Sequence, residues 1–214
     1  MKRELAVLFL FCGPLSMLVG GTVQGTLTLE AMKPAPSRPG YVPPQTKNPV
    51  QKPEMAPAIV YLERDDEKYP RARIHETVRI RQEGYQFRPS VVAVQTGSKV
   101  EFPNLDDEFH NVFSYSKAKR FDLGRFRKDE PTPEVLFNKA GVVKVYCEIH
   151  QHMRCLIVVL DTPWFTSTDS AGRFTLRNVP PGEYRLRVFQ PSEKLLQSQV
   201  TVSDGKTATV NFSR

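Results

Sequence analysis

The residues best suited to chemistry lie in one short segment, 145–153. Cys147, His150 and Met153 bring a thiol, an imidazole and a thioether within seven residues of sequence, directly after a β-rich run. A loop this tight can turn all three side chains toward one ion. Thiolate and thioether ligands, together with imidazole, select copper over hard cations. The spacing therefore predicts a soft metal site at this loop.

A second histidine is expected from an earlier strand. His110 follows a turn at residues 104–107 and leads into a strand-like run at 111–114. Two histidines and a cysteine with a weak axial methionine form the ligand pattern of blue-copper electron-transfer sites. We therefore predict one type 1 copper site whose ligands are His110, Cys147, His150 and Met153.

Two other interpretations of the same residues stay open. Cys147 and Cys155 can form a disulfide, which is the simplest role for two cysteines in an oxidising compartment. Zinc also binds cysteine and histidine, and a structural zinc site would take its fourth ligand from His152, Glu148 or Cys155. Copper is favoured because Met153 has the expected spacing and zinc rarely binds a thioether.

The elements that must position these ligands are strands. Short runs rich in Val, Ile, Phe, Tyr and Thr recur between Gly, Pro, Asn and Asp, and no useful amphipathic helical pattern occurs. This rhythm is typical of an antiparallel sandwich or barrel. We predict an all-β fold with strands within residues 22–30, 58–63, 77–81, 90–94, 99–102, 111–114, 135–137, 141–147, 155–160, 172–176, 182–189, 196–202 and 207–212.

The start of the chain predicts export. Residues 1–21 combine a basic start, the apolar stretch 5–18 and the small residues Gly20 and Gly21 at a cleavage point. A membrane anchor is disfavoured because the apolar run is short and broken, and a lipoprotein signal at Cys12 because a bulky residue precedes that cysteine. No later segment is apolar enough to span a bilayer. We expect a periplasmic or otherwise exported protein with no transmembrane segment after signal removal.

Composition and charge bear on the partners. The 214 residues allow one large domain or two small ones, and the formal charge is +7 with a pI near 9.4. A basic balance attracts acidic partners, anionic membranes or nucleic acid, but no nucleic-acid recognition motif occurs. We therefore expect an acidic protein partner and no nucleic acid. A basic run at residues 117–128 is either a solvated loop or the docking surface for that partner.

The copper-site segment resembles the cupredoxins, the small blue copper proteins, and most closely the amicyanin and plastocyanin type. Cys147, His150 and Met153 match the family's Cys-x-x-His-x-x-Met loop, and His110 followed by Asn-Val matches its upstream histidine. Weaker matches run through residues 85–106, and the resemblance covers roughly residues 77–160. It implies a Greek-key sandwich that holds one copper ion and passes single electrons.

The resemblance also implies roles for neighbouring residues. Asn111 would hydrogen-bond to the cysteine loop and hold the ligands in register. His150 would be exposed at the loop edge and serve as the electron exit. His152 stands where the family has an apolar or aromatic residue, and it is either an exposed edge residue or an alternative to Met153 as the axial ligand.

The flanks resemble a second family, the carboxypeptidase regulatory-like, transthyretin-like β-sandwich. Its rhythm appears in residues 168–174 and 180–184, with an Asp-x-x-Gly turn and a Pro-Pro-Gly turn. The expected organisation is a signal peptide at 1–21, the first strands of this sandwich at 22–65 with a proline-rich loop at 32–57, a copper domain at 70–162, and the remaining sandwich strands at 163–214. The copper module would then be inserted in, or flanked by, the smaller sandwich.

The functional hypothesis is an exported type 1 copper protein that carries single electrons between redox partners. It is not expected to be an enzyme, because the sequence has no Ser-His-Asp pattern, phosphate loop or second copper motif. The main alternative is an envelope binding or scaffold protein with structural or stored metal. A copper chaperone is a weaker third possibility.

Overall fold

The computed structural model describes residues 20–31, 56–64, 77–192 and 195–212. The predicted export signal up to residue 19 and the proline-rich loop from 32 to 55 lie outside these residues. The described residues form strands, turns and loops, so the prediction of an all-β fold is confirmed. Within this part of the chain, no helix has the length and apolar character needed to cross a membrane.

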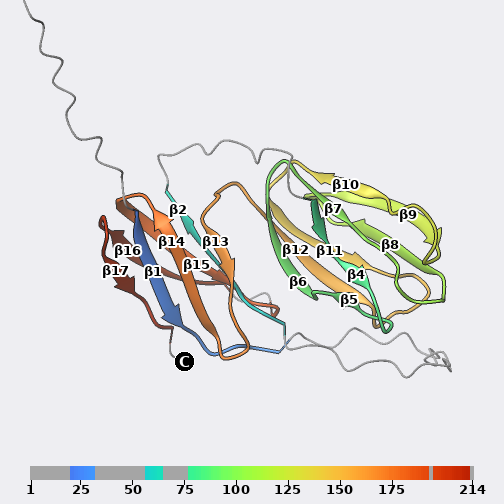
Figure 1. Ribbon diagram of the computed structural model, residues 1–214, viewed down its shortest axis with the longest axis horizontal. Coiled ribbons are helices and arrows are strands. Elements are labelled where there is room, and N and C mark those ends of the chain that lie inside the picture. The colour runs from blue at the N-terminus through green and yellow to red at the C-terminus, as the bar shows by residue number, and fades with distance from the viewer. Residues whose placement is uncertain (1–19, 32–55, 65–76, 193–194, 213–214) are drawn as a thin grey trace, which may run out of the picture.

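The middle of the chain builds one pair of facing sheets (Figure 1). The larger sheet has the order β6-β12-β11-β8-β9, formed by Val91–Gln95, Arg154–Leu160, Gly141–Tyr146, His110–Tyr115 and Arg120–Phe126. The smaller has the order β10-β7-β3, formed by Glu134–Phe137, Ser98–Glu101 and Thr77–Arg79. A short ladder joins β4 (Arg81–Gln82) to β5 (Phe87–Arg88). This unit, called the copper-side sandwich below, carries the predicted copper ligands: His110 begins β8, and Cys147, His150 and Met153 lie in the connection between β11 and β12.

The two ends of the chain build a second pair of sheets. One has the order β14-β1-β17, formed by Arg173–Val179, Gly21–Thr26 and Thr207–Thr209. The other has the order β13-β2-β15-β16, formed by Phe165–Ser167, Ile59–Glu63, Gly182–Phe189 and Leu195–Val202. Strands from before and after the middle segment therefore pair with one another, β1 with β14 and β2 with β15.

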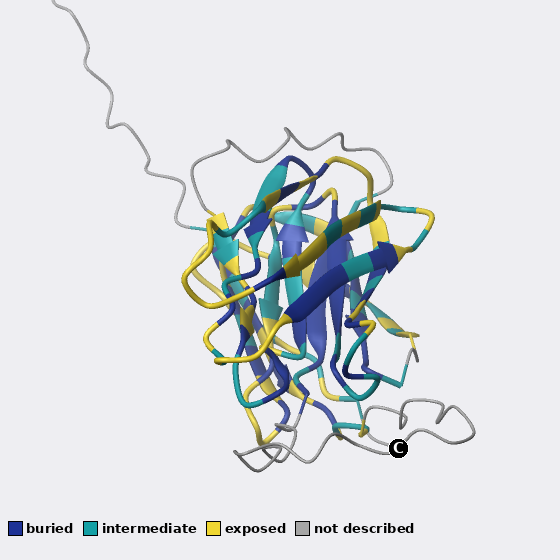
Figure 2. Ribbon diagram, turned by 90° about the vertical axis from the view of Figure 1, so that its right-hand side faces the viewer, coloured by how far each residue is buried: buried dark blue, intermediate teal, exposed yellow. Residues whose placement is uncertain are grey.

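Each pair of sheets encloses its own apolar core. One core contains Val100, Phe102, Phe137 and Val143, and the other contains Val23, Leu62, Phe174 and Leu186. Figure 2 views the molecule from one end and shows buried strand segments in the interior, with many of the exposed residues in the outer loops. Both units are therefore packed sandwiches.

A third apolar cluster joins the two sandwiches. It unites residues of β6 and β12 with residues of β2 and β15: Val91, Leu156, Val158, Leu160, Ile59, Tyr61 and Phe189, with Ala56 beside them. This contact explains why β12 reads as a continuous apolar run. Its alternate residues, Cys155 and Ile157 among them, face the copper-side core, while Leu156 and Val158 face the other sandwich.

The strand predictions fail mainly at the basic run. β9 occupies Arg120–Phe126, where no strand was predicted. Phe121 and Leu123 turn toward the core while Arg120 and Asp122 face solvent, and Gly124 adopts a positive φ of 69° in the same strand. The alternation of a half-buried strand was present, but its charged residues and central glycine concealed it.

Candidate metal centre

The three nitrogen and sulfur ligands predicted from sequence come together in the fold. His110 is the first residue of β8, while Cys147 and His150 lie in the connection between β11 and β12. One donor atom from each lies within 4.8 Å of the others, and all three side chains are buried. No other group of three or more such residues is brought together among the described residues.

The distances suit a single bound ion. His110 Nδ1 lies 3.0 Å from His150 Nδ1, and Cys147 Sγ lies 3.8 Å from His150 Nδ1. Metal–imidazole and metal–thiolate bonds are about 2.0–2.3 Å long, so an ion placed between either pair can touch both atoms. The donor set of two imidazoles and one thiolate fits copper. The side chains need little movement to receive an ion.

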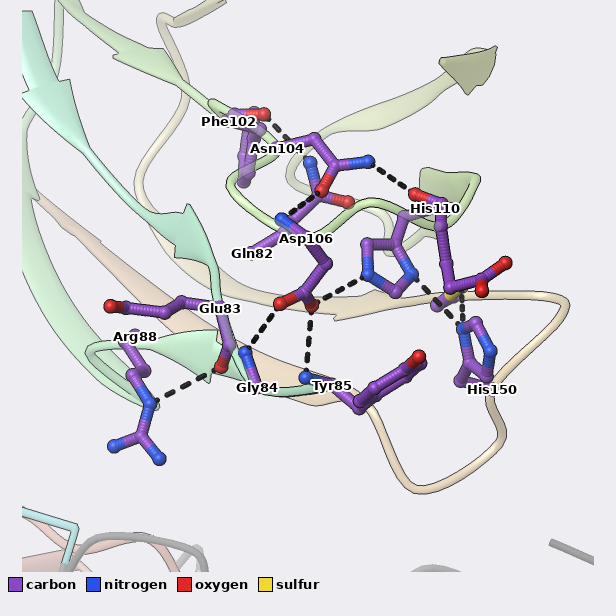
Figure 3. A network of polar contacts seen from close by, with 12 residues as sticks. Gln82, Glu83, Gly84, Tyr85, Arg88, Phe102, Asn104, Asp106, His110 and His150 are labelled. Carbon is purple, nitrogen blue, oxygen red and sulfur yellow. Dashed lines mark hydrogen bonds and ion pairs between the residues drawn. The ribbon is translucent and has the colours of Figure 1, made fainter. Parts of the chain in front are cut away.

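Asp106 orients the ring of His110 (Figure 3). Its Oδ2 lies 2.9 Å from His110 Nε2, on the ring edge opposite Nδ1. The same carboxylate accepts hydrogen bonds from the backbone amides of Gly84 and Tyr85. Burial opposes its charge, but the bonds from His110 and these amides prevail and lower the pKa of Asp106. The ionised carboxylate holds a proton on Nε2, so Nδ1 faces the other donors and is the nitrogen that can bind a metal once it has released the proton that it donates to Cys147.

A turn holds Asp106 in place. The side-chain oxygen of Asn104 accepts a hydrogen bond from the Asp106 amide at 2.9 Å. The side-chain nitrogen of Asn104 donates to the carbonyls of Glu108 and Phe126. Asn104 is only 3% exposed, so this turn is part of the interior rather than a surface loop.

The environment of Cys147 favours the thiolate. Burial raises the pKa of a thiol, but hydrogen bonds from His110, from His150 and from the backbone amides of Asn111 and His150 outweigh it. Together they lower the pKa of Cys147 to about 6. The thiolate is the form that binds metals. At neutral pH the site therefore presents an anionic sulfur beside two imidazoles.

Met153 closes the cysteine loop. Its carbonyl accepts a hydrogen bond from the Cys147 amide at 3.2 Å, and its own amide donates to the carbonyl of His150 at 2.8 Å. Its side chain is fully buried in the core that also contains Cys147. Met153 as the axial ligand stays a prediction.

Two expectations drawn from the resemblance are wrong. His150 is 4% exposed, so its ring is not open to solvent at the loop edge. The ring of Tyr85 packs against the His150 ring with centroids 5.1 Å apart, and the ring of His152 lies 6.1 Å from that of His150. His152 is itself half-buried rather than an exposed edge residue. These neighbours separate the ligand from water.

Asn111 bonds to the cysteine loop as expected, but through its backbone and not through its side chain. Its side-chain nitrogen donates to Asp122 Oδ1 at 2.8 Å and to the Gly124 carbonyl at 3.2 Å, both in β9. Its side-chain oxygen is buried and makes no hydrogen bond. Asn111 reaches the cysteine loop only through its backbone amide, which bonds to Cys147. The side chain therefore fixes β8 to β9 rather than to the loop.

The disulfide alternative does not occur in this structure. Cys147 and Cys155 are both free and buried. Cys155 lies in β12, opposite Val145, and complete burial raises the pKa of its thiol. It is an apolar core residue rather than a ligand. Glu148, a candidate fourth zinc ligand, is partly exposed and forms an ion pair with Arg125 at 2.6 Å.

The basic run is partly neutralised. Besides the Arg125–Glu148 pair, Lys128 lies 3.8 Å from Asp107. Arg120 and Arg127 instead stack over Tyr115 and Phe109 at 5.3 and 4.3 Å from the ring centroids. The segment is thus a mixture of strand, ion pairs and cation–aromatic contacts.

Sequence reasoning missed two residues of the site, Asp106 and Tyr85. Asp106 stands four positions before His110, a spacing that a turn can close. Tyr85 follows Gly84 at a turn between two short strands, and its contact with the site depends on the whole sandwich. A carboxylate preceding a ligand histidine was the one signal available.

One protein family matches part of the chain. The carboxypeptidase regulatory-like domain matches residues 156–213, which confirms that resemblance for the C-terminal flank. The matched range begins inside β12, in the copper-side sheet, whereas β1 and β2 of the other sandwich precede it. No curated protein sequence matches the chain.

Solved structures similar to this chain include copper proteins. A copper-containing nitrite reductase from Thermus scotoductus SA-01 is 22% identical with a TM-score of 0.38, and the match covers 44% of this chain and 26% of the reductase. A purple cupredoxin from Nitrosopumilus maritimus is 22% identical over 38% of this chain and 98% of its own, with a TM-score of 0.34. A variant of amicyanin in its Cu(I) form is 17% identical with a TM-score of 0.37, and the match covers 47% of this chain and 97% of the amicyanin chain.

Proposed function

We propose that this chain is an exported type 1 copper protein that carries single electrons between redox partners. The observation that carries the proposal is the buried convergence of two imidazole nitrogens and one low-pKa thiol on a single point. His110, Cys147 and His150 would hold the ion, with Met153 as the axial ligand. Bound copper would supply one-electron chemistry.

The donor set favours copper over zinc. A structural zinc site requires four ligands drawn from cysteine, histidine or carboxylate. Among the described residues, the cluster has three such donors, and Glu148 is engaged with Arg125. Met153 adds a buried thioether in the same core as Cys147, and two imidazoles and a thiolate with a thioether are a donor set suited to copper. Zinc is therefore the less favoured occupant.

The chain's contribution is a pre-set ligand geometry. Asp106 fixes the ring of His110, backbone amides stabilise the Cys147 thiolate, and the loop bonds of Met153 fix the turn. Ligands held in this way move little when the charge of the ion changes. Little reorganisation then opposes electron transfer. Burial of the donors supports a carrier rather than an enzyme, because a reaction would need room for a substrate.

The partner and the location belong to the same proposal. An acidic redox protein would dock at the exposed basic and aromatic residues of β9 and its flanks, such as Lys117, Arg120 and Tyr115. Export to the periplasm or beyond rests on the N-terminal signal pattern. Strand pairings support a copper domain inserted into the regulatory-like sandwich, since β1 and β2 pair with strands that follow the copper-side strands in sequence.

A second candidate is a binding or scaffold protein, and one observation favours it. The regulatory-like sandwich carries an open groove of about 270 Å³, which is lined by Gln24, Gly25, Thr26, Arg173, Phe174, Thr175, Thr209 and Asn211. In that case the metal would be structural or stored, and the groove would hold the ligand.

Electrochemistry of the copper-loaded full chain distinguishes these functions. An electron carrier gives a reversible one-electron wave and keeps one copper per chain through repeated cycles. The matched control, Cys155→Ser, leaves this wave in place because Cys155 is not a ligand, whereas Cys147→Ser removes it. A scaffold protein with stored metal would give no reversible wave or would release copper on reduction, and either result contradicts the proposal.

A further inference from the structure

Tyr85 is held in an unfavourable backbone conformation next to the metal centre. It lies in the turn between β4 and β5 with a φ of 59°, and its side chain is 3% exposed. Bulky residues rarely adopt positive φ, and such strain persists only where the surroundings enforce it. The fold therefore places an aromatic ring here at a conformational cost that glycine at this position would avoid.

The ring packs against both ligand histidines. Its centroid lies 5.8 Å from that of His110 and 5.1 Å from that of His150, with the planes nearly perpendicular in both cases. The two imidazoles are themselves 4.8 Å apart. The three rings thus form a compact set of edge-to-face contacts, which are favourable aromatic geometries. Figure 3 shows Tyr85 alongside the two histidines, on the far side from Asn104.

The turn is anchored on both sides of the site. The Tyr85 amide donates to Asp106 Oδ2 at 2.9 Å, and the Gly84 amide donates to Asp106 Oδ1 at 2.7 Å. On the other side, the ring of His152 donates a hydrogen bond to the Tyr85 carbonyl. Asp106 belongs to the His110 side and His152 to the cysteine loop. The turn therefore bridges the two segments that supply the ligands.

We propose that the ring of Tyr85 closes the metal centre to water and small anions, and that the hydrogen bond from His152 holds the Tyr85 turn in place. The proposal rests on the proposed copper site and gives a reason for the burial of His150. A closed centre exchanges electrons through the protein and does not bind a small-molecule substrate at the ion. Tyr85 would then help to make the site a carrier, because its removal would give water and small anions access to the ion.

The first test uses the metal-free protein, so it does not depend on copper. Cys147 is alkylated with iodoacetamide at about pH 8 in the wild type and in Tyr85→Gly, with the buried Cys155 as the internal reference. We expect alkylation of Cys147 to be about tenfold faster or more in Tyr85→Gly, because a thiolate reacts as soon as it is accessible. Tyr85→Phe, which keeps the ring, should stay within about twofold of the wild type.

A matched control separates the ring from the backbone strain. Asn178 is the other non-glycine residue with positive φ among the described residues, at 55°, and it lies in β14 of the other sandwich. Asn178→Gly relieves the same kind of strain without touching the site, and it should leave alkylation of Cys147 unchanged. If Tyr85→Gly does not fold, Tyr85→Asn replaces it, since asparagine tolerates positive φ. Equal rates of Cys147 alkylation in the wild type and in Tyr85→Gly, or in Tyr85→Asn where it is used, overturn the proposal.

The second test uses the copper-loaded chain and azide as the probe. Azide should change the visible spectrum of Tyr85→Gly and leave the wild type and Tyr85→Phe unchanged. Copper should enhance the proton relaxation of solvent water only weakly in the wild type. A strong enhancement in the wild type would by itself overturn the proposal that Tyr85 excludes water from the ion. If no thiolate–copper band forms in the wild type, the proposed function fails while the alkylation result still decides whether Tyr85 closes the site.

Discussion

At the scale of single residues, the site depends on which nitrogen of His110 faces the other donors. Asp106 accepts from Nε2, so Nδ1 points to His150 Nδ1 at 3.0 Å. A ring with the opposite tautomer would direct a proton toward the metal position. In the proposed site, the carboxylate would therefore contribute to metal binding without touching the ion.

Asp106→Asn tests this role. The amide has one acceptor oxygen, so it cannot accept from His110, Gly84 and Tyr85 as the carboxylate does. We expect copper affinity to fall by about 10- to 100-fold, measured by competition with a chelator. Asp107→Asn is the control, because the Asp107 side chain is exposed and its ion pair with Lys128 is long, at 3.8 Å. Equal affinities in the two variants would contradict the assignment.

The pKa of Cys147 predicts a pH-dependent signal in the metal-free protein. Thiolate absorbance in the ultraviolet should titrate with a midpoint near 6, below the ordinary value of 9.0. Because the folded pKa is the lower one, ionisation contributes stability fully above pH 9, and this contribution is lost as the pH falls from 9 to 6. Cys147→Ser should remove both effects. A midpoint near 9 in the folded wild type would show that the amides and imidazoles do not stabilise the anion.

The three clustered ligands could be predicted from sequence because their chemistry is encoded locally. Cys147 and His150 share one loop, and His110 precedes a recognisable strand. Tyr85 and the burial of His150 could not be predicted. Both depend on how the β4–β5 turn packs against a loop more than sixty positions later in the sequence. Long-range packing of this kind leaves no periodic signal.

At the scale of elements, glycine positions decide whether strands can approach closely. A Cβ at Gly25 in β1 would lie 1.7 Å from the carbonyl oxygen of Val210 and 2.8 Å from Phe174. The backbone of the segment after β17 therefore passes directly over β1. No side chain fits at this position without displacing that backbone.

Gly25→Ala should destabilise the regulatory-like sandwich by about 3 kcal/mol or more, because backbone must move to relieve the overlap. The visible spectrum of the copper form should not change, since the ligands lie in the other sandwich. Gly205→Ala is the control: its φ is 65° and its surroundings are open, so strain alone costs about 1 kcal/mol. Denaturant unfolding measures both. A Gly25 variant as stable as the Gly205 variant would contradict the packing.

Strand prediction succeeded where burial is simple and failed where it is mixed. β11 and β15 alternate buried and half-buried residues between clear turns, and both were expected close to their observed bounds. β9 carries arginines and an aspartate on its outer face and a glycine near its centre, so composition concealed its periodicity. The edge position of β9 in the sheet accounts for that charge, because edge strands commonly carry charged residues.

At the scale of the whole molecule, the two sandwiches share an apolar contact. Phe189 of β15 is 7% exposed and packs in the cluster with Leu156 and Val158 of β12. β12 thus contributes to the copper-side core with one face and to the other sandwich with the opposite face. Unfolding of either sandwich should therefore affect the other.

Phe189→Ala tests this coupling. The lost contact should cost about 3 kcal/mol, and one cooperative thermal transition should separate into two. Bound copper would stabilise only the folded copper-side sandwich, so it should raise the temperature of the single transition in the wild type and of only one of the two transitions in the variant. Leu195→Ala is the matched control for Phe189→Ala, because Leu195 is the strand partner of Phe189 but is 48% exposed. A single transition with the wild-type copper shift in Phe189→Ala would mean that the cluster does not couple the units. Calorimetry gives these results directly.

The central claim is that a thiolate and two imidazoles of this chain bind one copper ion, and spectroscopy of the Cu(II) form tests it most directly. The wild type should show an intense visible charge-transfer band and the small copper hyperfine splitting of a thiolate-bound ion, and Cys147→Ser should lose both. A copper-loaded wild type without that band, or a Cys147→Ser spectrum identical to it, would contradict the account.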